Sequence, residues 1–143
     1  MASTVASFDP ARIAGLLPTK ADEGPWTAGE VEAVYGDLSG DLDRLNGELT
    51  EANADLAGLL ADSGGAGDDQ ADTGSRALER EQALSLVNTL QDMIVQTELA
   101  IARLVGGTFG VCEACGEPLG KARAQAFPRA MLCVACKQRE ERR

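Results

Sequence analysis

Four cysteines in two close pairs limit how this chain can fold more than any other feature. Two residues separate Cys112 from Cys115, two separate Cys133 from Cys136, and seventeen lie between the pairs. Two residues between cysteines let one tight turn direct both sulfurs at a single ion, and two such turns complete a tetrahedron with metal–sulfur distances of about 2.3 Å. The spacing predicts one zinc ion with four protein ligands, which leaves no position for water and makes the zinc structural.

Two disulfides, a rubredoxin-like iron site and unrelated free thiols are the alternatives to zinc. We expect a cytoplasmic protein, because the first twenty residues lack the basic start and apolar block of a secretion signal. No run approaches the roughly 18 apolar residues of a membrane span, so no membrane partner is expected. Cysteine pairs in a reducing cytosol favour metal over disulfides, although the ligands alone do not separate zinc from iron.

A long amphipathic segment precedes the cysteines. Thr27 and Glu30 match a capping box, which predicts that a helix begins there. From Val31 the apolar residues recur at alternating steps of four and three, which is a heptad seam typical of a helix packed on another helix. The seam consists of Val31, Tyr35, Leu38, Leu42, Leu45, Leu49, Ala52, Leu56 and Leu59. Several interior glycines weaken this helix, so it requires a partner.

A second heptad seam supplies the partner helix, which is predicted to begin near Ser75 or Arg76 and to end at Gly106 and Gly107. The seam consists of Val87, Leu90, Ile94, Thr97, Ile101 and Leu104. Similar lengths and a short connection favour an antiparallel hairpin within one chain, and hence a monomer. An intermolecular coiled coil, belonging to an interaction protein, remains the alternative.

The predicted fold is mainly α: a long antiparallel coiled-coil hairpin with a small C-terminal four-cysteine zinc finger and a terminal helix. Its parts are an N-terminal segment with a short helix at 1–26, the hairpin at 27–105 with an acidic tip at 62–75, and the finger with the C-terminal helix at 106–143. Asp9 and Pro10 predict the start of the short helix, and Pro18 its end. Trp26 and Tyr35 are expected to pack this segment against the hairpin.

Charge is unevenly distributed along the chain. Residues 1–120 hold 21 acids and 6 bases, a net of −15, whereas residues 121–143 hold 7 bases and 2 acids, a net of +5. A chain with an overall charge of −10 is not expected to bind nucleic acid over its whole surface. The absence of histidine removes the usual general base and every Ser-His or Cys-His nucleophile. We therefore expect a binding protein and not an enzyme.

The C-terminal part carries a specific motif. Residues 107–120 read GTFGVCEACGEPLG, followed by Arg123, Ala126, Pro128 and the sequence LCVACK at 132–137. This pattern closely resembles the DksA/TraR zinc-finger family over about 68–139, whereas residues 27–67 match in coiled-coil character alone. The resemblance implies a transcription regulator whose hairpin enters the secondary channel of bacterial RNA polymerase, with no sequence-specific DNA binding.

In that family a tip motif, Asp-x-x-Asp-x-Ala, approaches the polymerase active centre. The matching positions here are Asp69, Asp72 and Gly74. The resemblance therefore implies that Asp69 and Asp72 act at the active centre, and the alternative is a solvated acidic loop. Gly74 in place of alanine removes a small apolar contact and loosens the start of the second helix.

Some family members bind ppGpp jointly with polymerase through bases near the finger. The matching positions hold Gln96, Phe127 and Lys137, of which only Lys137 is basic, so strong ppGpp dependence is not expected. Arg123, Lys137 and Arg139 are candidate contacts to polymerase or a nucleotide. The alternative for the basic tail is a solvated helix end whose charge complements the helix dipole.

A DNA-binding finger of the GATA type is a second functional hypothesis, because it shares the cysteine spacing and a basic tail. Against it, the loop 116–132 holds only Lys121, Arg123 and Arg129 as bases. An acidic hairpin would in addition repel phosphate.

Overall fold

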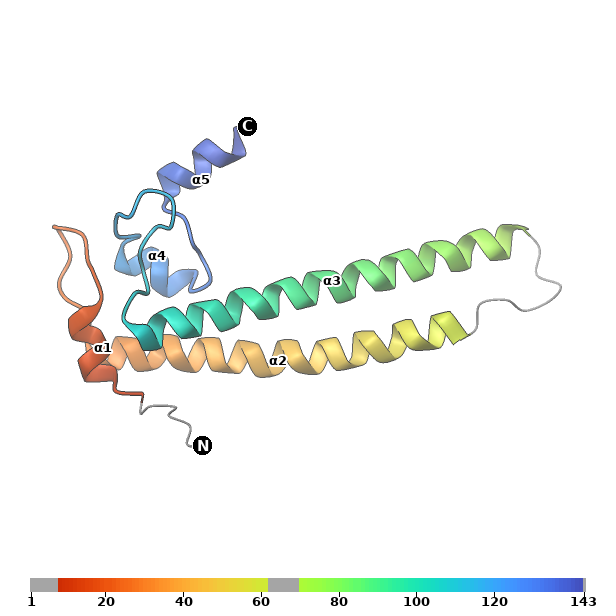
Figure 1. Ribbon diagram of the computed structural model, residues 1–143, viewed down its shortest axis with the longest axis horizontal. Coiled ribbons are helices and arrows are strands. Elements are labelled where there is room, and N and C mark those ends of the chain that lie inside the picture. Colours follow the sequence, from red (N-terminus) through yellow and green to blue (C-terminus); the bar gives the residue numbers. More distant parts are fainter. Residues whose placement is uncertain (1–7, 62–69, 143) are drawn as a thin grey trace. The chain divides into compact units, whose positions relative to one another are not determined.

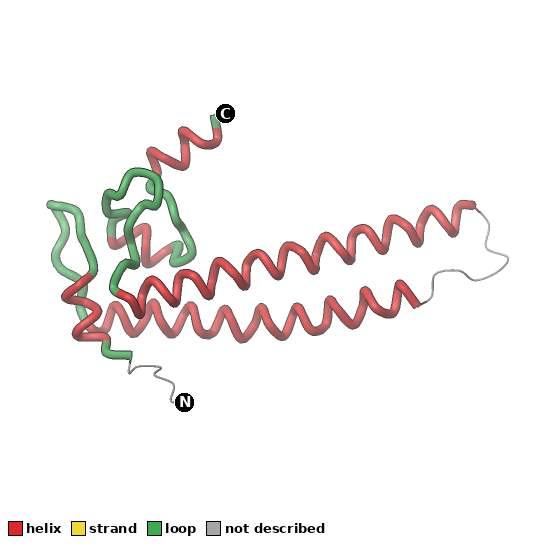
Figure 2. The backbone as a smooth tube through the Cα atoms, viewed as in Figure 1, coloured by secondary structure: helices red, strands yellow, loops and turns green. Residues whose placement is uncertain are grey.

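The computed structural model describes residues 8–61 and 70–142, and this part of the chain is mainly helical (Figures 1 and 2). The helices are α1 (Pro10–Leu16), α2 (Ala28–Ala61), α3 (Gln70–Gly106), α4 (Lys121–Ala126) and α5 (Val134–Glu141). The described residues contain no strand, only an isolated antiparallel bridge between Val111 and Pro118. None of the described helices combines the length and apolarity that a membrane crossing needs.

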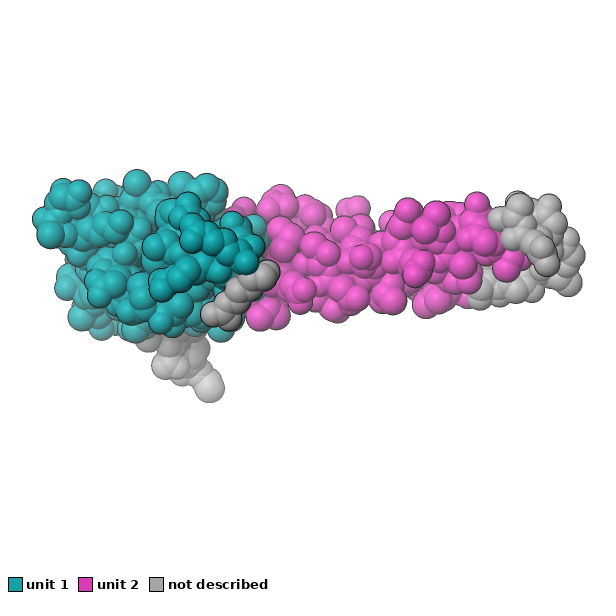
Figure 3. Space-filling view, turned by 90° about the horizontal axis from the view of Figure 1, so that it is seen from above, with its two compact units in different colours: residues 1–40, 96–143 teal, residues 41–95 magenta. Residues whose placement is uncertain are grey.

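The chain forms two compact units (Figure 3). One comprises Met1–Gly40 and Gln96–Arg143, and the other comprises Asp41–Val95. The long helices α2 and α3 contribute to both units, so each unit contains a stretch of the helix pair. We call residues 28–40 of α2 and 96–106 of α3 the hairpin base.

Both helix starts that the sequence predicts on the N-terminal side are confirmed. Asp9 is the N-cap of α1, accepting a hydrogen bond from Arg12 N at 3.3 Å, and Pro10 occupies the first turn. At the start of α2, Thr27 and Glu30 exchange hydrogen bonds: Thr27 N donates to Glu30 Oε1 at 2.9 Å and Glu30 N donates to Thr27 Oγ1 at 3.1 Å. The hydrogen bonds at both helix starts satisfy backbone donors that the helices themselves leave without partners.

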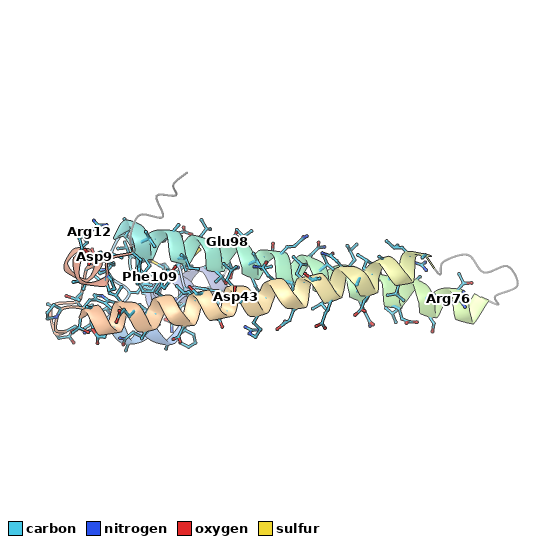
Figure 4. All side chains as sticks on the ribbon, turned by 90° about the horizontal axis from the view of Figure 1, so that it is seen from below. Asp9, Arg12, Asp43, Arg76, Glu98 and Phe109 are labelled. Atoms are coloured by element: carbon cyan, nitrogen blue, oxygen red, sulfur yellow. The ribbon has the colours of Figure 1, made fainter. Side chains whose placement is uncertain are left out.

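The unit at 41–95 is a helix pair joined by the predicted seams. Its core joins Leu45 and Ala52 of α2 to Val87, Leu90 and Ile94 of α3, with Leu42, Leu49, Leu56 and Met93 packed around them. Charged side chains such as Asp43 lie exposed on the helix surface (Figure 4). Fully burying a leucine contributes about 1.5–3 kcal/mol, so this narrow seam accounts for the pairing of two glycine-containing and acidic segments.

The unit at 1–40 and 96–143 has a broader core. It joins the hairpin base to α1 and to the start of the finger, and its buried members are Ile13, Ala14, Leu17, Trp26, Val31, Val34, Leu38, Ala100, Leu104, Phe109 and Ala124. Phe8 stacks on Tyr35 with ring centroids 4.1 Å apart. The expected packing of the N-terminal segment against the hairpin through Trp26 and Tyr35 is therefore confirmed.

The pairing is antiparallel, as the two cores show. Residues 31–38 of α2 share a core with 100–104 of α3, and residues 42–56 share one with 87–94. Residue numbers rise along one helix as they fall along the other, which confirms the hairpin.

The start of α3 differs from its prediction near Ser75 or Arg76. The helix begins at Gln70, so residues 70–75 of the expected tip are helical and Gly74 lies exposed inside the helix. One interior glycine costs a helix only about 1 kcal/mol relative to alanine, which is too little to end a long helix at Gly74.

Candidate metal centre

The first cysteine pair lies in a turn fixed by backbone hydrogen bonds. Cys112 N donates to Glu117 O at 2.9 Å, and Gly116 N donates to Cys112 O at 2.9 Å. Gly116 adopts φ +76°, in the left-handed region that other residues rarely enter. This reversal places Cys112 and Cys115 on the same side of one tight loop.

The second pair uses the start of a helix. Cys133 is the N-cap of α5, and its Sγ accepts a hydrogen bond from Cys136 N at 3.4 Å. Glu113 N donates to Met131 O at 2.9 Å, which connects the first loop to the segment that leads into Cys133. The two turns therefore face each other across a short distance.

All four predicted ligands converge. The sulfurs of Cys112, Cys115, Cys133 and Cys136 lie within 4.8 Å of one another. The separation between the Cys115 and Cys133 sulfurs is 3.9 Å, whereas a disulfide requires about 2.05 Å. A zinc tetrathiolate with bonds of about 2.3 Å has sulfur–sulfur edges of about 3.8 Å, so the donor set fits one zinc ion.

The thiols of this cluster have widely spread pKa values. Burial opposes ionisation of Cys112, yet backbone hydrogen bonds, the largest at Cys133, lower its pKa to about 6. A side-chain hydrogen bond with Cys133, followed by burial, raises the pKa of Cys136 to about 12. Sulfurs this close repel one another as thiolates, and a divalent cation removes that obstacle to ionisation. The four cysteines hold one structural Zn²⁺, which stabilises the finger fold.

Arg139 supports the metal centre, a role that the sequence hypothesis did not assign to it. Its Nη2 donates to Cys136 Sγ at 3.1 Å. A guanidinium donor beside a thiolate ligand offsets part of the negative charge that four sulfurs bring to one ion. The sequence feature that indicates this contact is the distance of three residues from Cys136 to Arg139, which puts both side chains on one face of a helix.

The other candidate basic residues, Arg123 and Lys137, make separate contacts. Arg123 Nε donates to Leu132 O at 3.2 Å, and its guanidinium lies 5.7 Å from the ring centroid of Phe127. Lys137 forms an exposed ion pair with Glu141 at 3.6 Å. Phe127 is 60% exposed, and Gln96 is also exposed. Arg123 thus has a structural contact of its own, which joins α4 to the residue before Cys133.

The predicted tip residues lie at the edge of what the structure describes. Asp69 falls outside the described residues, whereas Asp72 occupies the first turn of α3 and Gly74 follows within the same helix. Their proposed role at a polymerase active centre is a functional hypothesis and is taken up below.

Comparison with known proteins agrees with this geometry. The model of the prokaryotic dksA/traR C4-type zinc finger matches residues 107–142. The RNA polymerase-binding transcription factor DksA of Caulobacter vibrioides is 36% identical over 75 residues, which are 52% of this chain and 53% of that protein. The protein of the same name from Escherichia coli K12 is 36% identical over 63 residues, which are 43% of this chain and 42% of that protein.

A solved structure extends the likeness to the hairpin. The structure of transcription factor DksA2 from Pseudomonas aeruginosa matches with a TM-score of 0.66 and 26% sequence identity, covering 92% of this chain and 97% of that chain. The chain spans about half the length of the curated relatives that it matches in sequence. In its finger motif, its converging cysteines and its helical architecture, the chain is similar to the DksA/TraR family of C4-type zinc-finger proteins.

Proposed function

We propose that this protein is a transcription regulator that binds bacterial RNA polymerase and has no enzymatic activity of its own. The observation that carries the proposal is the combination of the dksA/traR finger with a fold similar to DksA2 over 92% of the chain. Relatives that share the finger are named RNA polymerase-binding transcription factors. The zinc ion has four protein ligands and therefore serves to fold the finger.

The hairpin is the part that we propose to enter the secondary channel of polymerase. A narrow antiparallel helix pair suits a channel, and the charges on its surface suit an aqueous environment. In the proposal Asp69 and Asp72 act near the catalytic Mg²⁺ or compete for channel contacts, and thereby alter the stability of open promoter complexes. Gly74 gives this tip less apolar contact than the alanine of the family motif.

Several further properties belong to the same proposal. The protein works in the cytoplasm as a monomer, since both heptad seams find their partners in one chain. It recognises no DNA sequence, because the chain is strongly acidic. Its dependence on ppGpp is weak, because an exposed Phe127 and an uncharged Gln96 stand where bases would be needed. Arg123, Lys137 and Arg139 contribute positive charge toward polymerase at the finger.

A photo-crosslinking experiment with purified bacterial RNA polymerase tests the binding mode. The photoreactive group is placed at Ser75, an exposed position near the start of α3, and as a control at Asp22, an exposed position in the N-terminal segment. We expect the protein to co-migrate with polymerase in gel filtration and Ser75 to crosslink to the subunits that line the secondary channel, whereas Asp22 does not. Failure to co-migrate would overturn the proposal, and channel crosslinks from Asp22 alone would overturn the orientation.

A further inference from the structure

Lys121, the first residue of α4, makes close contacts with residues nearly a hundred positions earlier in the chain. Its Nζ lies 2.9 Å from Glu30 Oε1 and donates to Pro25 O at 3.1 Å. The same ammonium lies 5.8 Å from the ring centroid of Trp26. The Lys121 side chain is only 16% exposed, so these contacts are better shielded from solvent than an ordinary surface ion pair.

Glu23 adds a second connection at the same place. Its carboxylate accepts hydrogen bonds from Lys121 N at 2.7 Å and from Lys20 N at 3.0 Å. Gly120, the N-cap of α4, has no side chain to satisfy the first turn, and Glu23 supplies the missing acceptor. The beginning of α4 is therefore capped by a residue of the N-terminal segment.

Trp26 links these polar contacts to the finger loop. It is 5% exposed, and its Nε1 donates to Pro18 O at 3.3 Å. The rings of Trp26 and Phe109 form a T-shaped pair with centroids 5.9 Å apart. Phe109 stands three residues before the first zinc ligand, Cys112. Packing of Trp26 thus depends on the same loop whose shape the metal fixes.

We propose that Glu23, Glu30 and Lys121 form a latch that couples the fold of the zinc finger to the hairpin base. Glu30 belongs to the capping box of α2, so one carboxylate both starts the hairpin helix and holds Lys121 of the finger. When the metal leaves, the loop between Phe109 and Lys121 loses its fixed shape. The latch then opens and exposes Trp26. The latch does not depend on polymerase binding and goes beyond the proposed function.

The single tryptophan of the chain makes the latch measurable. Lys121→Met keeps most of the apolar stem and removes the charge. The matched control is Lys137→Met, because Lys137 forms an ion pair that is 57% and 63% exposed in the same unit. A second latch variant, Glu30→Gln, retains the capping acceptor while removing the carboxylate charge. Binding of Co²⁺ by each purified full-length variant, followed by its thiolate absorption bands, shows that the finger folds.

We expect Lys121→Met and Glu30→Gln, in the zinc-loaded protein, to raise acrylamide quenching of Trp26 by about twofold to fivefold, whereas Lys137→Met matches the wild type. The double variant should show less than the sum of the two effects, because both changes remove the same contact. Chelation of zinc from the wild type should produce a red shift of Trp26 emission and a similar rise in quenching. Wild-type quenching in both latch variants, or a chelated protein whose Trp26 stays protected, would overturn the latch.

Discussion

Cys112 and Cys136 are the buried ligands of the metal centre, whereas Cys115 is exposed. The buried pair receives little help from water, so their charge depends on the cation and on donors such as Arg139. The cysteine spacing was sufficient to predict the four ligands, because a two-residue gap leaves little freedom in where the sulfurs point. The contact from Arg139 depends on the helix that begins after Cys133, and therefore on the folded finger.

Replacing the most buried ligand tests the zinc assignment at this scale. In Cys112→Ser we expect zinc binding to fall from one ion per chain to much less than one, because a serine hydroxyl is a poor zinc ligand in a thiolate site. Helicity at 41–95 should persist, since its core contains no finger residue. Metal analysis and circular dichroism provide the measurements, and retention of one tightly bound zinc would contradict the assignment.

Two glycine substitutions are expected to change stability in opposite directions. Gly107 has φ +82°, and an added Cβ would lie 2.8 Å from Leu16 Cδ1, so Gly107→Ala should destabilise its unit by about 1–2 kcal/mol. Gly47 lies on the exposed surface of α2 with nothing within 4 Å of an added Cβ, so Gly47→Ala should stabilise the hairpin by about 1 kcal/mol. Urea unfolding measures both, and the same sign for both would contradict the assigned backbone geometry.

At the scale of the elements, α2 and α3 could be predicted because the heptad period survives in the sequence. The start of α3 could not, since Gly74 and nearby acids suggest a loop, whereas the helix already begins at Gln70. The latch at Lys121 also escaped prediction, because no local pattern relates residues 23–30 to the first turn of α4. Contacts of that kind arise only when distant segments pack.

The seam at 41–95 should depend strongly on one leucine. Leu45 is fully buried, so Leu45→Ala should lower the free energy of unfolding by about 2–5 kcal/mol. Leu60 on the same helix is 55% exposed, and Leu60→Ala should change the free energy of unfolding by about 0.5 kcal/mol or less. Urea titration followed by circular dichroism compares them, and equal losses would refute the assigned seam.

Acid should weaken the contact between α4 and the start of α2. The hydrogen bond from Lys121, followed by that from Thr27, holds the pKa of Glu30 below its usual value of 4.5. A carboxyl with a lowered folded pKa contributes stability that is present above 4.5 and is lost as the pH falls through the lowered value. Acrylamide quenching of Trp26 in the wild type should therefore rise as the pH falls below 4.5. In Glu30→Gln the quenching should depend less on pH. An identical pH profile for both proteins would exclude Glu30 as the titrating group.

At the scale of the whole molecule, acidic and basic residues are concentrated in different parts of the chain. The net of −15 over residues 1–120 and of +5 over residues 121–143 gives the hairpin and the finger end different electrostatic preferences. Fold class and zinc site follow from periodicity and cysteine spacing. The proposed partner rests on the likeness to DksA/TraR proteins, because an acidic helix pair alone does not specify what it binds.

Transcription initiation with purified RNA polymerase, with and without ppGpp, tests the central claim most directly. We compare the wild type with Asp69→Asn/Asp72→Asn and with a control of equal charge change, Asp43→Asn/Asp55→Asn, at exposed positions of α2. The proposal predicts that the wild type and the control alter open-complex lifetime at sensitive promoters equally, with little added effect of ppGpp, and that the tip variant loses most of this activity. A tip variant with wild-type activity would contradict the proposed role of Asp69 and Asp72, and a wild type without effect on any promoter would contradict the proposed function itself.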